Sequence, residues 1–304
     1  MGAPQFRATD LVSLKEGQLS NRKAALSQID RPIRVGYRLS QTLGLRKNFR
    51  MRVLLYHGID SGDFQDFSRQ LDFLEKTWKF VSPEDFELYL QGTLKLDQDS
   101  LLLTFDDGFK SQREVVERVL NPRGISAIFF IITEYAKLSR GSDWRGFISK
   151  YVWPGLEQGS IPDHWQNMDA DDLNFLIETG HTIGSHSARH ERLSKVEVLA
   201  LSENICHSGD ELERLVGRPV KHFAYPFGDI DSFNASALEV ARSRFQFVHT
   251  GMRGNNTAAT NSWEIRRDSF EPTDSRNWVS AALDGLVDWK YRKNLDRFRS
   301  WGSN

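Results

Sequence analysis

Short apolar runs alternate with helical patterns through most of this 304-residue chain. The apolar runs predict strands at Arg52–Tyr56, Leu101–Phe105, Ser126–Ile132, Thr182–Ser185, Lys221–Tyr225, Phe245–His249 and Trp263–Arg267. The periodicity between them predicts helices at Asp66–Lys76, Pro83–Gln91, Ser111–Leu120, Ala170–Glu178, Lys195–Val216, Asn234–Ser243 and Ser275–Leu286. Such alternation is typical of a parallel sheet covered by helices, and uninterrupted apolar strands such as Leu101–Phe105 indicate burial on both faces, as in a barrel.

One segment breaks the alternation. Residues 136–167 carry five aromatic residues among Gly, Ser and Pro and have weak periodicity, which predicts a long inserted loop. Its aromatic side chains either line the rim of a ligand site or anchor the loop to the barrel. The sequence leaves both readings open.

Composition excludes several classes of protein. Hydrophobic residues make up 39% and charged residues 27%, which excludes a disordered chain. No apolar run approaches the roughly 20 residues of a membrane-spanning helix. Cys206 is the only cysteine, so no intrachain disulfide forms. With no secretory pattern at the start, we expect a cytoplasmic protein, and the net charge of −1 gives no reason to expect nucleic acid as a partner.

Both ends of the chain are basic. Residues 1–52 hold eleven Lys or Arg against three Asp or Glu, and the stretch Arg22–Leu45 has loosely helical apolar spacing. An amphipathic helix there would dock on a partner, on an anionic membrane at the inner face, or on the protein itself. A second basic stretch covers Trp289–Arg299. We therefore divide the chain into a basic N-terminal extension (1–51), a barrel (52–289) and a basic C-terminal tail (290–304).

Adjacent carboxylates end the predicted strand Leu101–Phe105. Asp106 and Asp107 follow it directly, and Gly108 allows the sharp turn that would bring both toward one cavity. Because adjacent carboxylates repel each other, keeping both ionised requires a cation. The pair predicts a metal site, although an Asp at this position also serves as a helix N-cap.

Two imidazoles end another strand. His186 and His190 follow Thr182–Ser185, and residues four apart on a helical turn share a face. With one carboxylate from a second strand, they make a set of two histidines and one carboxylate, which leaves coordination positions open for water and substrate. A third strand ends in the Tyr225-Pro226-Phe227-Gly228 turn, whose backbone N–H groups can stabilise an oxyanion. Taken alone, this segment is only a strand that ends in a Pro/Gly turn.

The three motifs TFDDGF (104–109), SHSARH (185–190) and FAYPFG (223–228), in this order, resemble the polysaccharide deacetylases of carbohydrate esterase family 4, the NodB homology family. The FAYPFG turn is similar to that of one subgroup. The resemblance covers about residues 52–270. It implies a distorted (β/α) barrel of about seven strands, one divalent metal ion, most often Zn²⁺, and hydrolysis of an N-acetyl group on an amino sugar.

The resemblance also implies roles for individual residues. Asp106 matches the general base, while Asp107, His186 and His190 match the metal ligands. The backbone N–H near Phe227 matches the oxyanion donor. From their places at strand ends, we also expect His57, Tyr225 and Pro226 to line the substrate cavity, with packing as the alternative for His57. Trp144 and Trp153 of the inserted loop are the candidates to stack on sugar rings.

The sequence departs from the family pattern at two points. Ala224 stands where the family usually has an arginine that orients the base, and we expect Arg267, from a later strand, to replace it as a partner of Asp106. Its neighbour Arg266 is the rival, since alternate strand residues face opposite sides. The late Leu-x-His motif that supplies the general acid is also missing. His249, the last histidine of the chain, is the candidate acid, with an ordinary buried histidine as the alternative.

These observations predict a metal-dependent hydrolase of an N-acylated amino sugar, free or within a nucleotide-linked, lipid-linked or polymeric glycan. One alternative is hydrolysis of another amide, by deformylation or ring opening. The other is a non-catalytic glycan-binding barrel, against which the intact set of Asp106, Asp107, His186 and His190 speaks.

Overall fold

The computed structural model describes residues 49–139 and 141–302. The proposed N-terminal extension therefore lies almost wholly outside the described residues. The strands are β1 (Met51–Tyr56), β2 (Lys79–Phe80), β3 (Ser100–Phe105), β4 (Ala127–Ile131), β5 (Thr182–Ser185), β6 (His222–Ala224), β7 (Phe247–His249) and β8 (Asp268–Ser269).

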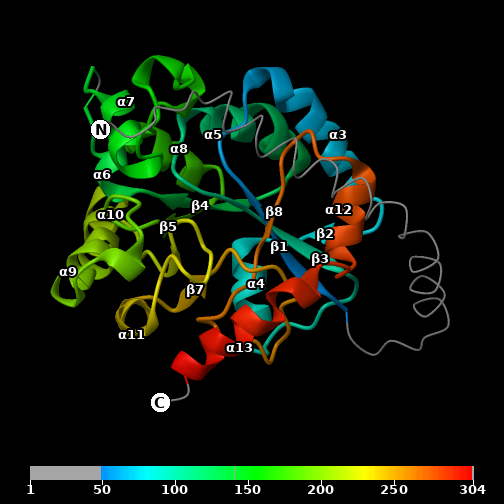
Figure 1. Cartoon of the computed structure of the whole chain (residues 1–304). Coiled ribbons are helices and arrows are strands. Elements are labelled where there is room, and N and C mark those ends of the chain that lie inside the picture. The colour runs from blue at the N-terminus through cyan, green and yellow to red at the C-terminus, as the bar shows by residue number, and fades with distance from the viewer. Residues whose placement is uncertain (1–48, 140, 303–304) are drawn as a thin grey trace.

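Seven of these strands form one continuous parallel sheet in the order β7-β6-β5-β4-β3-β1-β8, and β2 pairs with β3 beside this path. The sheet curls into a half-barrel (Figure 1). The predicted (β/α) barrel of about seven strands is thus confirmed. Between β7 and β8 the chain runs through residues 250–267, held to β7 by hydrogen bonds such as Ile265 N–H to the Val248 carbonyl (3.0 Å).

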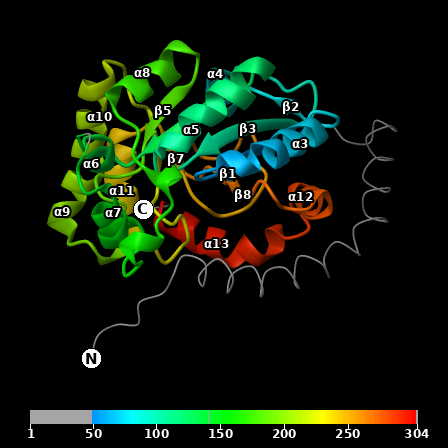
Figure 2. The same cartoon turned by 90° about the horizontal axis from the view of Figure 1, so that it is seen from above.

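Helices surround the strands (Figure 2). They are α3 (Phe64–Leu74), α4 (Pro83–Leu90), α5 (Lys110–Val115), α6 (Thr133–Ala136), α7 (Trp144–Phe147), α8 (Ala170–Glu178), α9 (Val198–Ser202), α10 (Ser208–Val216), α11 (Ala235–Arg244), α12 (Arg276–Leu283) and α13 (Arg292–Trp301). Several begin where the sequence places a capping side chain: Ser82 caps α4, and Asp169 and Asp172 form a capping box on α8.

Two of the predicted helices are interrupted by π-turns. Val116–Leu120 continues α5, and Glu203–His207 joins α9 to α10, so that the long pattern predicted from Lys195 becomes three connected pieces that begin at Val198. Such turns are a common feature of helices that pass functional sites.

The core has two layers. One group of side chains faces into the half-barrel and packs around Phe86, which extends from α4 into the interior. This group includes Val53, Leu102 and Phe130. Side chains on the other face of the same strands, such as Leu54 and Phe105, pack against the surrounding helices. Because both faces are covered, the strands read as continuous apolar runs, as the sequence indicates.

The predicted strand Trp263–Arg267 is wrong. Only Ile265 of this stretch bridges to a strand residue, His249, and the ladder with β1 begins one residue later, at Asp268. The stretch is instead held by its own turns: Glu264 N–H donates to the Asn261 carbonyl, and the Asn256 side chain bonds both the N–H and the carbonyl of Arg266. A short apolar run cannot show which of its residues will find a ladder partner.

The inserted segment is not a plain loop. Residues 136–167 form α7, a π-turn at Ile148–Val152 and two 3₁₀ turns, and they enclose a small core of their own around Phe147, Ile148 and Val152. Tyr135 stacks on Phe147 at 4.9 Å and ties this core to β4 and α6. The aromatic residues had no helical periodicity because each turn is only three to five residues long.

The basic stretch at the end of the chain is not a free tail. α13 buries Leu295 and Phe298 against the barrel, and Phe298 contacts Phe233 and Trp263 edge-on. Burial of a Phe contributes about 1.5–3 kcal/mol, enough to hold the helix in place. The predicted basic C-terminal tail is thus a helix that packs on the barrel.

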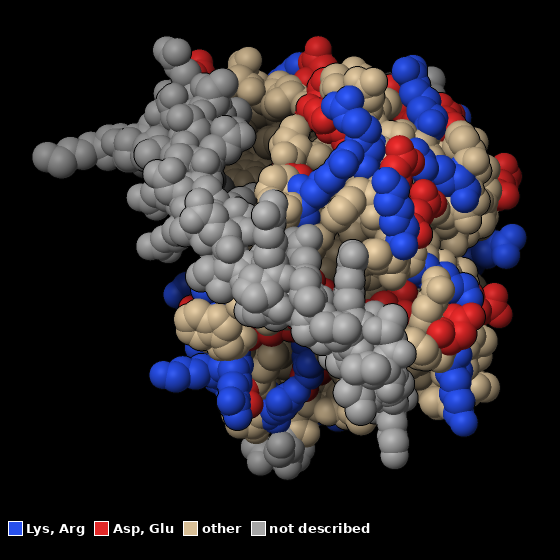
Figure 3. Space-filling model, turned by 90° about the vertical axis from the view of Figure 1, so that its right-hand side faces the viewer, with Lys and Arg blue, Asp and Glu red and all other residues tan. Residues whose placement is uncertain are grey.

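Among residues 49–139 and 141–302, no helix is long and apolar enough to span a membrane. On the face that Figure 3 presents, the described Lys and Arg side chains are interspersed with Asp and Glu. The part of that face that is visible thus carries no continuous basic patch.

Candidate active site

The carboxyl ends of β1, β3, β5 and β6 bring the predicted site residues together. Asp106 and Asp107 follow β3, and His186 follows β5. Ligand atoms of Asp107, His186 and His190 all lie within 4.8 Å of one another, and all three residues are buried. His186 Nε2 and His190 Nε2 each lie 3.5 Å from Asp107 Oδ1. Active sites of β/α barrels form at this end of the strands.

Strained backbone shapes these loops. In the described chain, four residues other than glycine have positive φ: Asp107 (79°), Ser187 (66°), His190 (62°) and Phe227 (63°). All four lie in the three motifs. The predicted helical turn from His186 to His190 is wrong, because the left-handed residues make a loop that folds the second imidazole back to within 5.0 Å of the first. Such strain persists only where surrounding structure imposes it, and it gathers at functional sites.

His186 is oriented to offer one nitrogen to the site. Its Nδ1–H donates to the Ala224 carbonyl (2.8 Å), which leaves the lone pair of Nε2 directed at the two carboxylates. Burial lowers the pKa of His186 to about 4, so the ring is neutral near pH 7. A neutral imidazole whose other nitrogen is fixed by a backbone carbonyl is the usual form of a metal ligand.

Asp107 is the less stabilised of the two carboxylates. Its Oδ1 is buried without a hydrogen bond, as is Nδ1 of His190. Burial and the neighbouring Asp106 raise the pKa of Asp107 well above its ordinary value. A bound cation would remove this penalty, since an opposite charge favours the ionised form. The unpartnered oxygen and the two neutral imidazoles therefore fit a divalent metal ion.

Asp106 is held by an arginine. Arg267 Nη1 and Nη2 donate to Asp106 Oδ1 (2.6 Å) and Oδ2 (2.9 Å), while Arg267 Nε donates to the Thr250 carbonyl (3.0 Å). Burial raises the pKa of Asp106, but the Arg267 charge outweighs that effect and holds the pKa below its ordinary value. The expected ion pair is thus present, and the rival Arg266 turns away to Glu264. The catalytic role of the pair stays a prediction.

His57 lies beside Asp106. Tyr56 pairs with Phe105 at the end of the β1–β3 ladder, so the next residue of each strand, His57 and Asp106, leaves the sheet at the same level. A positive charge on its ring would lower the pKa of Asp106, His186 and His190, so the ring lies near all three. His57 is only partly buried. It therefore borders the candidate site, and its contact with a substrate stays a prediction.

His249 does not enter the site. It is fully buried in the barrel interior, edge-on to Phe130 (4.8 Å), and its Nε2 lies 3.0 Å from His222 Nδ1. His222 in turn contacts Glu87 of α4 (3.0 Å). Since no face of His249 is exposed, the alternative of a buried histidine describes it, and the candidate acid is misassigned.

The turn after β6 divides its residues between core and site. Tyr225 is fully buried and stacks on Phe233 at 3.9 Å, so its side chain is not available to a substrate, contrary to expectation. Pro226 is also buried. Phe227 is 40% exposed, its ring lies 4.6 Å from the ring of His190, a candidate metal ligand, and its φ of 63° is strained.

The inserted segment forms one wall next to the site. Trp165 stacks on Phe109 (5.5 Å), two residues after Asp107, and Trp153 stacks on Trp165 (6.2 Å). Gly58, after His57, has no room for a side chain, because a Cβ there would lie 2.9 Å from Phe109. Trp144 and Trp153 both pack against the insert's own core, which supports the anchoring interpretation of its aromatic residues.

One residue that shapes the site was missed. Gln112 is fully buried on α5, and its amide donates to the carbonyl of Asp106 (2.5 Å), which fixes the turn between the two carboxylates. A glutamine in the first turn of a predicted helix gives no sign in the sequence that it faces inward.

Comparison with known proteins agrees with this site. The family model for polysaccharide deacetylases matches residues 93–244, half of the chain. The chain therefore belongs to the polysaccharide deacetylase family, whose members remove acetyl groups from polysaccharides. YxkH of Bacillus subtilis (strain 168) is 20% identical over 247 residues, which cover 79% of this chain and 78% of that protein.

Solved structures share the fold. The deacetylase PplD of Streptococcus pyogenes, determined with acetate, is 18% identical and has a TM-score of 0.62, covering 78% of this chain and 99% of that one. IcaB from Ammonifex degensii is 23% identical with a TM-score of 0.61, covering 78% and 97%. The half-barrel is thus the fold of known deacetylases.

Proposed function

We propose that this protein hydrolyses the N-acetyl group of an amino sugar within a glycan, with the help of one divalent metal ion. The observation that carries the proposal is the juxtaposition of two units: the Asp107, His186 and His190 set, and the Asp106 carboxylate in the fork of Arg267. One unit fits a Lewis-acid cation and the other a general base. The proposal includes membership of the subgroup with the FAYPFG turn, supported by Arg267 reaching Asp106 where Ala224 cannot.

Asp107, His186 and His190 would hold the ion, which we propose is Zn²⁺ and which when bound polarises the acetyl carbonyl. Asp106 accepts the proton of the attacking water, and its lowered pKa keeps it ionised for that purpose. Arg267 keeps both carboxylate oxygens oriented. The backbone N–H of Phe227 stabilises the oxyanion that develops on the former carbonyl oxygen.

Expulsion of the amine requires a proton, and we assign its donor to His57. His57 leaves β1 beside Asp106 and is partly exposed, whereas His249 is sealed in the barrel interior. A general acid must lie within hydrogen-bonding reach of the leaving group, directly or through one water. Of the two histidines, only His57 borders the space that a substrate would enter.

This assignment predicts different outcomes for two matched variants. His57→Gln lowers kcat by about 10²-fold or more, because general acid catalysis is lost, while metal content is retained. His249→Gln changes thermal stability more than kcat, since it disturbs a buried pair with His222. Steady-state kinetics, metal analysis and thermal unfolding of both proteins measure this, and the opposite ranking of kcat would restore His249 as the acid.

Release of acetate from defined substrates tests the function. The purified protein, with and without added Zn²⁺, is incubated with oligosaccharides of N-acetylated amino sugars, nucleotide-linked sugars and their N-formyl counterparts. Mass spectrometry is expected to show loss of the acetyl mass from at least one acetylated sugar, abolished by a chelator and restored by Zn²⁺. Loss of only the formyl mass would favour the deformylase alternative, and metal-independent turnover would contradict the proposed chemistry.

A further inference from the structure

Arg267 lies directly before β8, one of the two shortest strands of the described chain. β8 has two residues, and its register with β1 consists of the pairs Leu54 with Asp268 and Leu55 with Ser269. On its other side, β8 has no strand partner in the described chain. Two ladder pairs alone do little to prevent a shift of β8 in register. The Arg267 guanidinium must nevertheless lie within hydrogen-bonding distance of both Asp106 oxygens.

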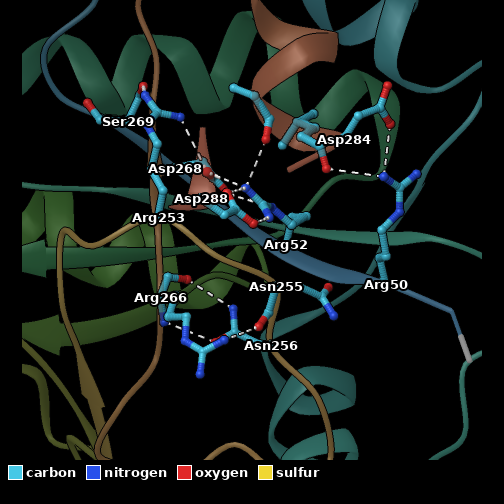
Figure 4. A network of polar contacts seen from close by, with 12 residues as sticks. Arg50, Arg52, Arg253, Asn255, Asn256, Arg266, Asp268, Ser269, Asp284 and Asp288 are labelled. Carbon is cyan, nitrogen blue, oxygen red and sulfur yellow. Dashed lines mark hydrogen bonds and ion pairs between the residues drawn. The ribbon is translucent and has the colours of Figure 1, made fainter. Parts of the chain in front are cut away.

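A buried ion pair holds the residue after Arg267. Asp268 is fully buried and receives two hydrogen bonds from Arg52 of β1, Nε to Oδ2 (2.8 Å) and Nη2 to Oδ1 (2.7 Å). Arg253 adds a contact from Nη1 to Oδ1 (3.3 Å), and its other nitrogen donates to the Ser269 carbonyl. Figure 4 shows Asp268 and Asp288 both bonded to the guanidinium of Arg52, with Arg253 on the far side of Asp268.

The two neighbours face opposite sides of the sheet. Arg267 enters the barrel toward Asp106, and Asp268 points outward to Arg52, as alternation along extended backbone requires. A slip of one residue would exchange these directions and remove Arg267 from the site. The bidentate bond between Arg52 and Asp268 fits only one register, because a planar guanidinium and a carboxylate meet in one geometry.

We propose that Asp268, through its ion pair with Arg52, is a positioning residue for catalysis: it fixes the register of β8 and thereby holds the Arg267 guanidinium on Asp106. The inference rests on the proposed roles of Asp106 and Arg267. Asp268 touches no reacting atom and acts through its neighbour alone.

A double-mutant cycle separates positioning from general structural support. Asp268→Asn is made in the wild type and in Arg267→Lys, a background in which the planar fork is already lost. In the wild-type background, kcat falls by about 10- to 100-fold, the size that misplacement by about 1 Å produces. KM and metal content change little. In the Arg267→Lys background, the same substitution lowers kcat less than about twofold, because coupled residues are not additive.

The matched control is Asp284→Asn. Asp284 also pairs with an arginine of the same region, Arg50 (2.9 Å), but this pair does not reach β8 (Figure 4). It is expected to leave kcat unchanged. An equal fall of kcat in both backgrounds would mean that Asp268 only stabilises the fold, and no fall in the wild-type background would overturn the inference as well.

A structural readout keeps the inference testable apart from activity. In a crystal structure of Asp268→Asn, we expect the Arg267 fork to have left at least one Asp106 oxygen, and an unchanged fork would overturn the inference even if no substrate is found. If Asp268→Asn does not fold, Arg253→Gln replaces it in the same cycle and crystal analysis. Arg253 makes the longer bond to Asp268, so we expect a smaller fall of kcat. Absence of deacetylation by the wild type would refute the proposed function and leave this structural test standing.

Discussion

Asp106→Asn is expected to lower kcat by about 10²–10⁴-fold, the range lost when a general base is removed. The amide is nearly the same size as the carboxylate and still accepts from Arg267, so the local fold is kept. The metal is also retained, because Asp107, His186 and His190 make up the ligand group. Kinetics together with metal analysis of the purified variant measure both effects.

The control for this variant is Asp172→Asn. Asp172 is a fully buried carboxylate, paired with Lys110 and Arg113 on the outer side of the barrel. Its substitution lowers stability without a comparable effect on kcat. Near-normal turnover by Asp106→Asn would show that Asp106 is a structural partner of Arg267 and that the proton of water goes elsewhere.

His186→Ala is expected to abolish metal binding and activity together. The substitution removes one of three ligand groups and leaves the Ala224 carbonyl without its donor. Because burial keeps the pKa of His186 near 4, the wild-type ring needs to lose no proton to bind a cation at pH 7. Zinc content by atomic spectroscopy and acetate release are measured on the same preparation.

His181→Gln provides the comparison. His181 is also buried, with a pKa lowered by burial to about 4, but it lies before β5, at the opposite end of that strand from His186. This variant is expected to bind as much Zn²⁺ as the wild type. Full zinc occupancy in His186→Ala would overturn the ligand assignment, whatever the activity.

Much of the fold was predictable because burial leaves a direct trace in the sequence. β3 contains the apolar run Leu101-Leu102-Leu103 because both of its faces are covered, and Asp169 is a capping residue that marks the start of α8. Where the trace is weak, prediction failed. The two residues of β8 are polar, Asp268 and Ser269, and are held in the sheet by an arginine 216 positions away. No local pattern distinguishes them from a loop.

The sequence by itself determined which side chains meet. Asp106 and His186 each stand directly after a buried parallel strand, with Asp107 one residue further, and in such a sheet those ends share one edge. Only the tertiary structure decided how they meet. The left-handed Ser187 and His190 close the histidine loop, and the β1–β3 register places His57 beside Asp106 while the barrel interior encloses His249. The physical reason is that strand ends follow from local burial, whereas register, loop handedness and the choice between two histidines depend on contacts between residues far apart in the chain.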